Sequence, residues 1–162
     1  MCASGCVEKL RPDAPITISL ASDHAGFPLK ETLKNHLESK GYAALDFGTW
    51  SEEPVDYPRY VRAAALSVAS GEATLGIVIG GSGNGEAIAA NKIKSIRCAV
   101  CWNAKSARLA KEHNNANMIA LGARMFPTEE ALRIVDAWLG AEFRGGRHQA
   151  RIDMIEEVAI ER

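Results

Sequence analysis

The sequence predicts an α/β protein in which a parallel sheet is covered by helices on both faces, a three-layer αβα sandwich. Three observations carry this prediction. Short β-branched or apolar runs alternate with segments of helical periodicity along the chain. The run at residues 74–79 is mostly apolar, as expected for a parallel strand buried on both faces. The chain has 162 residues, 47% of them hydrophobic, which suffices for one well-buried core.

The expected elements follow one another with no domain boundary and no internal repeat. Strands are expected at residues 16–21, 42–47, 74–79, 98–102 and 118–121, and helices at residues 28–40, 58–70, 86–92, 104–113 and 128–139. Leu29, Leu33 and Leu37 recur on one face of the first helix. Pro28 suits its first turn and Gly41 suits its end. Five strands joined by helices predict one parallel sheet.

The two ends of the chain differ from this alternation. Residues 1–15 contain glycine and proline and are expected to form a mobile tail, so that a single domain spans residues 16–162. A helix from Arg147 to about residue 160 follows two glycines and has no strand after it. We expect a C-terminal arm that packs on its own domain or reaches a second subunit. In the helix at residues 128–139, Thr128 is expected to be the N-cap.

Charge and hydropathy exclude several classes of protein. Lys plus Arg is 19 and Asp plus Glu is 20, so a net charge of −1 argues against nucleic acid or an anionic membrane as the main partner. No run approaches the roughly 20 apolar residues of a membrane helix. The first 15 residues contain no apolar stretch typical of a secretory signal. We expect a cytoplasmic protein.

The four cysteines agree with that location. Cys98 and Cys101 form a C-x-x-C, which read alone could be a redox pair or half a zinc site. On a strand, however, residues three apart point to opposite faces, roughly 10 Å apart, so two buried thiols are the favoured interpretation. A zinc site that adds Cys2 and Cys6 is the less favoured alternative. The four histidines show no paired ligand spacing, and we expect neither a metal nor a cofactor.

The glycine-rich stretch at residues 80–85, GGSGNG, is the strongest local signal. It fails the dinucleotide pattern G-x-G-x-x-G, and it matches only half of the phosphate-loop pattern. Glu86 and Ala87 stand where that loop needs lysine and a hydroxyl. Backbone donors of Gly81, Gly83 and Gly85, with Ser82 and Asn84, could instead stabilise a developing oxyanion.

Glu86 would then act as a base beside these donors. This pairing suits proton abstraction next to a carbonyl, which produces an enediolate. The alternative is a glutamate favoured at a helix start only by the helix dipole, and the motif taken alone favours that alternative.

Ligands of an open parallel sheet bind beyond the carboxyl ends of its strands, where several polar residues are expected. Asp23 and His24 follow the first strand, Tyr57 ends the loop after the second, and Arg124 follows the fifth. The ordinary structural alternative for the pair of Asp23 and His24 is a turn with a cap.

Two further groups lie at helix ends. His113 and Asn114 end the helix before the fifth strand, where a histidine is commonly only a favourable dipole contact. Functionally, His113 could exchange protons near neutral pH. Arg147 and Arg151 are four residues apart and could grip a phosphate together, although a solvated face is the usual outcome for such a pair.

Taken together, these segments resemble the type B ribose-5-phosphate isomerase family, which includes allose- and galactose-6-phosphate isomerases. The matching stretches are residues 22–26 (SDHAG), 56–58 (DYP), 80–86 (GGSGNGE), 89–92 (AANK), 112–115 (EHNN), 121–124 (LGAR), 135–138 (VDAW) and 147–151 (RHQAR). The resemblance implies a Rossmann-like five-stranded sandwich and a cofactor-free aldose–ketose isomerase of the pentose phosphate pathway. It also implies a homodimer with active sites built from both subunits, and a tetramer is the alternative assembly.

The resemblance also implies roles for individual residues. Asp23 would bind the sugar near its ring oxygen, and Tyr57 would line the pocket. His113 would help open the ring, with Asn114 on sugar oxygens. The phosphate would be bound by His24, Arg124, Arg147 and Arg151, at least one arginine coming from the partner subunit.

One departure concerns the base. Many family members carry a catalytic cysteine where this chain has Gly80, whereas a second branch uses a glutamate at position 86. The chain resembles the second branch, so thiol reagents should not abolish activity through a catalytic thiol. The alternatives are the same chemistry on a six-carbon sugar phosphate and a non-catalytic sugar-phosphate-binding module. A nicotinamide enzyme is the least favoured.

Overall fold

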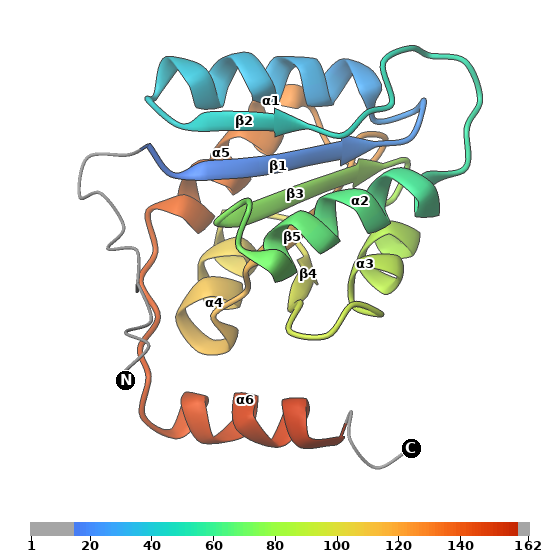
Figure 1. Ribbon diagram of the computed structural model, residues 1–162. Coiled ribbons are helices and arrows are strands. Elements are labelled where there is room, and N and C mark those ends of the chain that lie inside the picture. Colours follow the sequence, from blue (N-terminus) through green and yellow to red (C-terminus); the bar gives the residue numbers. More distant parts are fainter. Residues whose placement is uncertain (1–14, 159–162) are drawn as a thin grey trace, which may run out of the picture.

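Parallel strands form the centre of the computed structural model, which describes residues 15–158. The strands are β1 (Thr17–Ser22), β2 (Ala43–Asp46), β3 (Leu75–Gly80), β4 (Cys98–Val100) and β5 (Met118–Gly122). The helices are α1 (Phe27–Ser39), α2 (Tyr57–Ser70), α3 (Asn84–Ala90), α4 (Ala104–Asn114), α5 (Thr128–Leu139) and α6 (Arg147–Val158). The five strands lie in the order β2-β1-β3-β5-β4, all parallel (Figure 1). The predicted sheet is confirmed.

The helices cover the two faces of the sheet in separate groups. α1, α4 and α5 bury Leu33, Ala107 and Trp138 against one face, in one apolar cluster with alternate strand residues such as Ile77. α2 and α3 cover the other face, where residues such as Val61 form a second cluster. The predicted three layers are therefore present. α6 lies outside them, below α4 in Figure 1.

The first helix forms as its sequence predicts. Leu29, Leu33 and Leu37 are buried on one face, and the proline after Phe27 lies in the first turn. Gly41 follows the helix at φ +87°, a left-handed conformation that glycine adopts without a Cβ clash.

Most element ends lie within one residue of the expectations, and three of the differences have a clear physical cause. Thr128 is not the cap of α5: it is the first helical residue, and Pro127, in an extended conformation, precedes it. β4 is shorter than expected because the N–H groups of Trp102 and Asn103 donate to the Ser106 hydroxyl in the capping box of α4. α3 begins two residues early, since Gly83 turns the chain at φ 80°.

The C-x-x-C pair behaves as the strand periodicity predicts. Cys98 packs in the cluster under α2 and α3, whereas Cys101 packs in the cluster on the opposite face. Both are buried free thiols. The tail expected at residues 1–15, with Cys2 and Cys6, lies outside the described residues except for Pro15. No helix in the described range is long and apolar enough to cross a membrane.

The topology itself marks a place for a ligand. The chain runs from β1 outward to β2, then returns to place β3 on the other side of β1. The connections after β1 and β3 therefore leave the sheet in opposite directions and open a crevice at their carboxyl ends.

Candidate functional site

A pocket of about 530 Å³ lies at the carboxyl ends of β1 and β3. It is lined by Asp23, Tyr57, Gly81, Ser82, Gly85, Glu86, Arg124 and Met125. Seven of these eight residues are among those that the sequence singled out. The structure thus brings together segments that lie up to about one hundred residues apart in the chain.

The segment after β1 is held tightly against β3. The Asp23 N–H donates to the Ile79 carbonyl at 3.2 Å, and a carboxylate oxygen of Asp23 accepts from the Gly26 N–H at 2.8 Å. A side chain on Gly26 would overlap the Ile79 backbone, so only glycine permits this approach. Asp23 is therefore both the cap of a turn and a wall of the pocket, and its second oxygen is available to a ligand.

The glycine-rich turn offers donors to the same space. Among the described residues, the N–H groups of Gly81, Ser82 and Gly83 have no backbone partner. The Ser82 Oγ accepts from the Asn84 N–H at 3.3 Å, which leaves its O–H to donate elsewhere. Gly83 packs on the Leu121 backbone with no room for a Cβ. Asn84 itself lines a neighbouring pocket.

Glu86 stands in the first turn of α3 with 3% of its surface exposed. Burial raises the pKa of Glu86 above its usual value, and the negative charge of Asp23 raises it further, against a lowering by the residue's own backbone N–H. A carboxylate with a raised pKa is a stronger base than an exposed one. The arrangement can therefore remove a proton from a ligand whose oxyanion rests on the glycine turn.

Two side chains close the pocket beside Glu86. The Tyr57 hydroxyl lies against the α-carbon of Gly85, where any Cβ would meet it. Arg124 lies over Gly81, and its N–H donates to the Gly81 carbonyl at 3.1 Å. Arg124 is a cation at the rim, suited to an anionic group of a ligand.

His24 lies next to this wall and joins it to the loop after β2. Its Nδ1 accepts a hydrogen bond from the Val55 N–H at 3.3 Å.

Four predicted residues form a second group, apart from the pocket. His113 and Asn114 end α4, and the His113 ring stacks on that of His148, with centroids 4.4 Å apart. Arg147 and Arg151 flank His148 on α6 and are exposed. Desolvation, the contact with His113 and the nearby arginine charges lower the pKa of His148.

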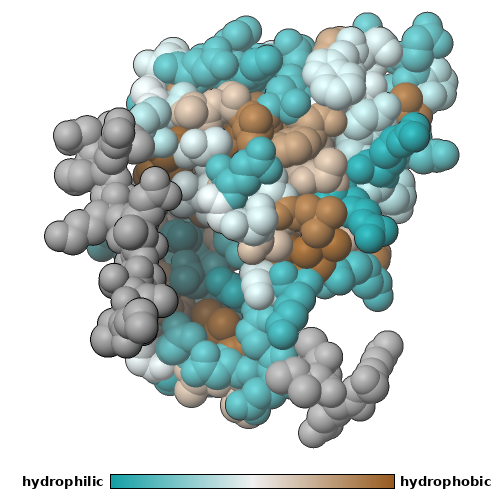
Figure 2. Space-filling view, in the orientation of Figure 1, coloured by the Kyte–Doolittle hydropathy of each residue, from teal (hydrophilic) through white to brown (hydrophobic). Residues whose placement is uncertain are grey.

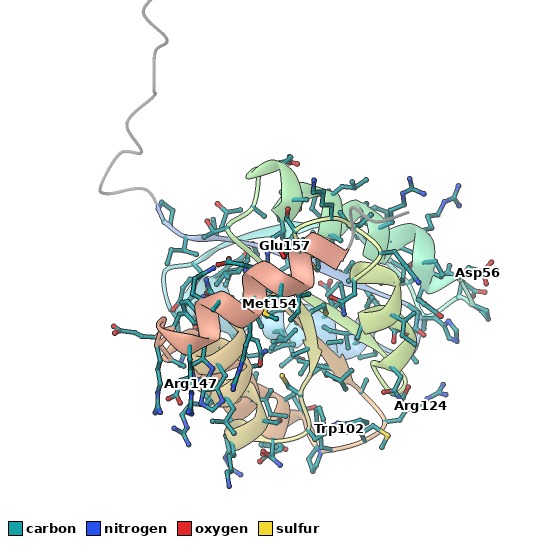
Figure 3. The ribbon with its side chains drawn as sticks, turned by 90° about the horizontal axis from the view of Figure 1, so that it is seen from below. Asp56, Trp102, Arg124, Arg147, Met154 and Glu157 are labelled. Carbon is teal, nitrogen blue, oxygen red and sulfur yellow. The ribbon has the colours of Figure 1, made fainter. Side chains whose placement is uncertain are left out.

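The two groups lie at opposite edges of the sheet. α4 begins beyond the carboxyl end of β4 and ends just before β5, at the amino edge. Figure 3 shows the separation, with Arg147 at the start of α6 and Arg124 on the far side of the molecule. Within one chain, the structure does not bring His113, Asn114, Arg147 and Arg151 to the pocket.

Two residues were missed by the sequence analysis. Met125 lines the pocket, and its only signal is its place directly after Arg124. His148 gave no ligand pattern, but its position between two arginines was a signal that it shares their surface. Among residues 15–158, no three His, Cys, Asp or Glu side chains are grouped as metal ligands would be.

Comparison with known proteins places the chain among sugar phosphate isomerases. The sequence profile of the family described as Ribose/Galactose Isomerase matches residues 18–155. Ribose-5-phosphate isomerase B of Escherichia coli (strain K12) is 48% identical over 141 residues, 87% of this chain and 95% of that protein.

Solved structures agree with that result. Ribose-5-phosphate isomerase B of Clostridium thermocellum is 48% identical, with a TM-score of 0.89 over 90% of this chain and 99% of the other. Ribose-5-phosphate isomerase B of Mycoplasma genitalium, solved with bound ribulose-5-phosphate, is 39% identical, with a TM-score of 0.86 over 91% of this chain and 98% of the other.

Proposed function

The chain belongs to the ribose/galactose isomerase family, and from that membership we propose that it interconverts D-ribose 5-phosphate and D-ribulose 5-phosphate. One observation in the pocket carries the proposal: the buried Glu86 carboxylate lies beside the backbone donors of the glycine turn and the Ser82 hydroxyl. The reaction is a step of the pentose phosphate pathway. A cytoplasmic location is part of the proposal, and the free thiols of Cys98 and Cys101 support it.

The chemistry follows from these positions. Glu86 removes the proton from C2 of the open-chain aldose, and the electron pair moves into the C1–C2 bond while the carbonyl oxygen takes up negative charge. Gly81, Ser82 and their neighbours donate to that oxygen. The proton of the C2 hydroxyl passes to the C1 oxygen, and Glu86 returns the abstracted proton to C1, which leaves the carbonyl at C2. No electron leaves the substrate, so the reaction needs no redox partner.

A carboxylate rather than a thiol is the proposed base. Position 80 is glycine, and burial raises the pKa of Cys101 to about 12. Burial and the charges of Cys101 and Glu86 also raise the pKa of the Cys98 thiol. Such thiols are not thiolates at neutral pH and make poor bases.

Substrate binding is proposed to involve both groups of residues. Asp23 and Tyr57 would contact the sugar, and His24 and Arg124 the phosphate, together with donors of the turn that includes Asn84. His113 would open the furanose ring, with Asn114 on sugar oxygens and two α6 arginines, Arg147 and Arg151, on the phosphate.

A homodimer with shared sites would unite the two groups, because one chain keeps them at opposite edges of the sheet. Exposed apolar side chains on α3, after β4 and on α6 support such an interface. They are Ile88, Trp102, Met154 and Ile155, each 42% to 63% exposed.

The test is turnover of ribose 5-phosphate, with a chelator present, by the native chain and by Glu86→Gln. Loss of one general base should lower the rate roughly 10²–10⁴-fold. Glu72→Gln, at an exposed position before β3, is the matched control and should keep the native rate. Turnover that survives Glu86→Gln would assign the base elsewhere. No native turnover would favour six-carbon sugar phosphates next, and binding without turnover would favour a non-catalytic module.

A further inference from the structure

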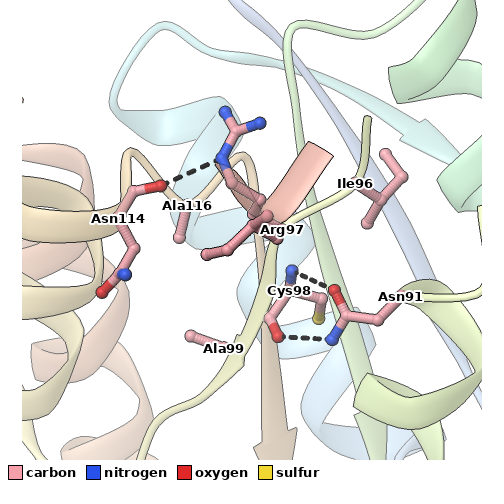
Figure 4. Close-up of a pocket in the computed structure, with 8 residues that line it drawn as sticks. Asn91, Ile96, Arg97, Cys98, Ala99, Asn114 and Ala116 are labelled. Carbon is pink, nitrogen blue, oxygen red and sulfur yellow. Dashed lines mark hydrogen bonds between the residues drawn. The ribbon is translucent and has the colours of Figure 1, made fainter. Parts of the chain in front are cut away.

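Arg97 joins three segments of the chain that meet at the second group of residues. It directly precedes β4, and its side chain is 20% exposed. Its Nε donates to the Asn114 carbonyl at 3.0 Å, as Figure 4 shows, and its Nη2 donates to the Asn115 carbonyl at 3.0 Å. Its Nη1 is 3.1 Å from a carboxylate oxygen of Glu156 on α6. Each guanidinium nitrogen therefore has an acceptor.

Two of these acceptors, the Asn114 and Asn115 carbonyls, have no other donor among residues 15–158. The last carbonyls of a helix lack intrahelical donors, and they carry the negative end of the helix dipole. Asn115 ends α4 in a left-handed conformation at φ 43°. A guanidinium placed there donates hydrogen bonds to two carbonyls, and its positive charge interacts favourably with the negative end of the helix dipole.

Arg97 is itself fixed by the sheet. Its N–H donates to the Asn117 side chain at 2.8 Å, and its carbonyl accepts from the Met118 N–H at 3.3 Å. Both partners lie at the start of β5. Arg97 is thus a rigid reference point from which the end of α4 and the arm are placed.

Within one chain, α6 needs such a reference because few of its side chains are buried against the domain. Of its residues 147–157, only Ile152 is buried. A pocket of about 340 Å³ separates the helix from β4, with Arg97, Cys98 and Ile155 in its wall. Figure 2 shows the surface hollowed between α6 and the rest of the domain. Besides the buried Ile152, the described contacts that hold the helix include the His148–His113 stack in the first turn and the Glu156–Arg97 pair near the end.

We propose that Arg97 is a positioning residue: it holds α4 and α6 in one register, and thereby sets the spacing between His113 and Asn114 on one side and Arg147 and Arg151 on the other. This inference rests on the proposed isomerase function, in which these four residues bind one substrate. Arg97 touches no reacting atom and acts through the elements that it ties together.

Two substitutions separate the two attachments. Glu156→Gln removes the charge that holds the arm and leaves α4 intact, so the KM for ribose 5-phosphate should rise roughly threefold to tenfold while kcat stays near native. Arg97→Lys keeps the charge, but an ammonium lacks the planar fork and cannot serve three acceptors. It should raise KM at least as much and also lower kcat, because His113 and Asn114 lose their support.

The double variant tests whether both act through one contact. Its KM should equal that of Arg97→Lys, since the effects of residues in direct contact do not add. The matched controls are Glu130→Gln and Arg133→Lys, which alter an exposed ion pair on α5. Amide hydrogen exchange in residues 147–158 gives a second readout: it should quicken in both test variants and not in the controls.

The outcomes distinguish this inference from the function on which it rests. No turnover by the native chain would overturn the isomerase proposal and, with it, the catalytic part of the inference. Unchanged amide hydrogen exchange in α6 of the test variants would overturn the claim that Arg97 holds α6 in place. Native turnover with an unchanged KM in Glu156→Gln would overturn the inference alone. So would an Arg97→Lys variant that loses only thermal stability.

Discussion

The Glu86 carboxylate occupies the space in which a side chain on Gly80 would stand. A Cβ built on Gly80 would overlap both carboxylate oxygens of Glu86. Gly80 ends β3 and has no positive φ, so backbone conformation does not demand glycine there. The close contact with the Glu86 carboxylate is what requires glycine at this position. Glycine at position 80 and the buried carboxylate at position 86 are therefore one structural unit.

Gly80→Ala should disable the enzyme by displacing Glu86. A methyl group at position 80 forces the carboxylate to another rotamer, and a shift of about 1 Å in a catalytic group costs on the order of 10²-fold in rate. Steady-state kinetics on ribose 5-phosphate measure the loss in kcat. In Gly81→Ala the new methyl meets no atom nearer than 3.6 Å, so its loss should be much smaller. Equal kcat in Gly80→Ala and the native chain would show that the observed Glu86 position is not required.

Glu86→Gln should make the protein more stable as it removes activity. Burial, with the Asp23 charge, raises the pKa of Glu86 in the folded state. The stabilisation from the protonated group is then complete below the usual value of 4.5 and is lost as pH rises through the folded pKa. Glutamine stays neutral throughout. The Tm difference between variant and native chain should be near zero at low pH and grow above pH 4.5. A lower Tm for the variant at pH 7 would contradict this reasoning.

Mixing two inactive variants should restore activity if the sites are shared. A Glu86→Gln chain keeps its His113, and a His113→Asn chain keeps its Glu86. In a mixed dimer one site then holds both substitutions and the other holds none. Refolding the variants together in equal amounts should recover roughly a quarter of the native rate, since half of the dimers are mixed. Recovery no greater than the sum of the separate variants would assign each site to a single chain.

Asp46→Asn should destabilise the fold strongly. Lys30 is fully buried, and its Nζ lies 2.7 Å from one carboxylate oxygen of Asp46. The other carboxylate oxygen of Asp46 accepts a hydrogen bond from the Gly48 N–H. Without Asp46 the buried ammonium keeps only the Glu31 carboxylate at 2.9 Å, which is 45% exposed, so the variant should lose up to about 3–5 kcal/mol. Urea unfolding at pH 7 measures the loss.

A second substitution provides the control for that prediction. Lys30→Met, added to Asp46→Asn, removes the stranded ammonium and should recover part of the stability. Burial alone would raise the pKa of Asp46, but the hydrogen bonds from Lys30 and Gly48 lower it below 3.8. Its contribution is therefore complete above pH 3.8 and is lost as pH falls further. A double variant no more stable than Asp46→Asn would contradict the stranded-charge explanation.

The element ends show where local sequence reasoning fails. Threonine is a common N-cap residue, but Pro127, in an extended conformation, takes the N-cap position before α5, and Thr128 is already helical. The capping box of Asn103 and Ser106 shortens β4 because side-chain hydroxyls compete with strand neighbours for the same N–H groups. Both results depend on hydrogen bonds whose alternatives are close in energy, and a propensity does not rank them.

The sequence by itself determined the order of strands and helices, the faces of Cys98 and Cys101, and the pocket residues from Asp23 to Arg124. Periodicity and the rule for parallel sheets suffice for these, because both are local or follow from strand direction. Tertiary structure alone decided that Glu86 lies over Gly80, that His148 stacks on His113, and that His113 lies at the opposite edge from the pocket. These relations depend on how separate elements pack, and no spacing along the chain encodes the distance between two elements that meet only in the folded state.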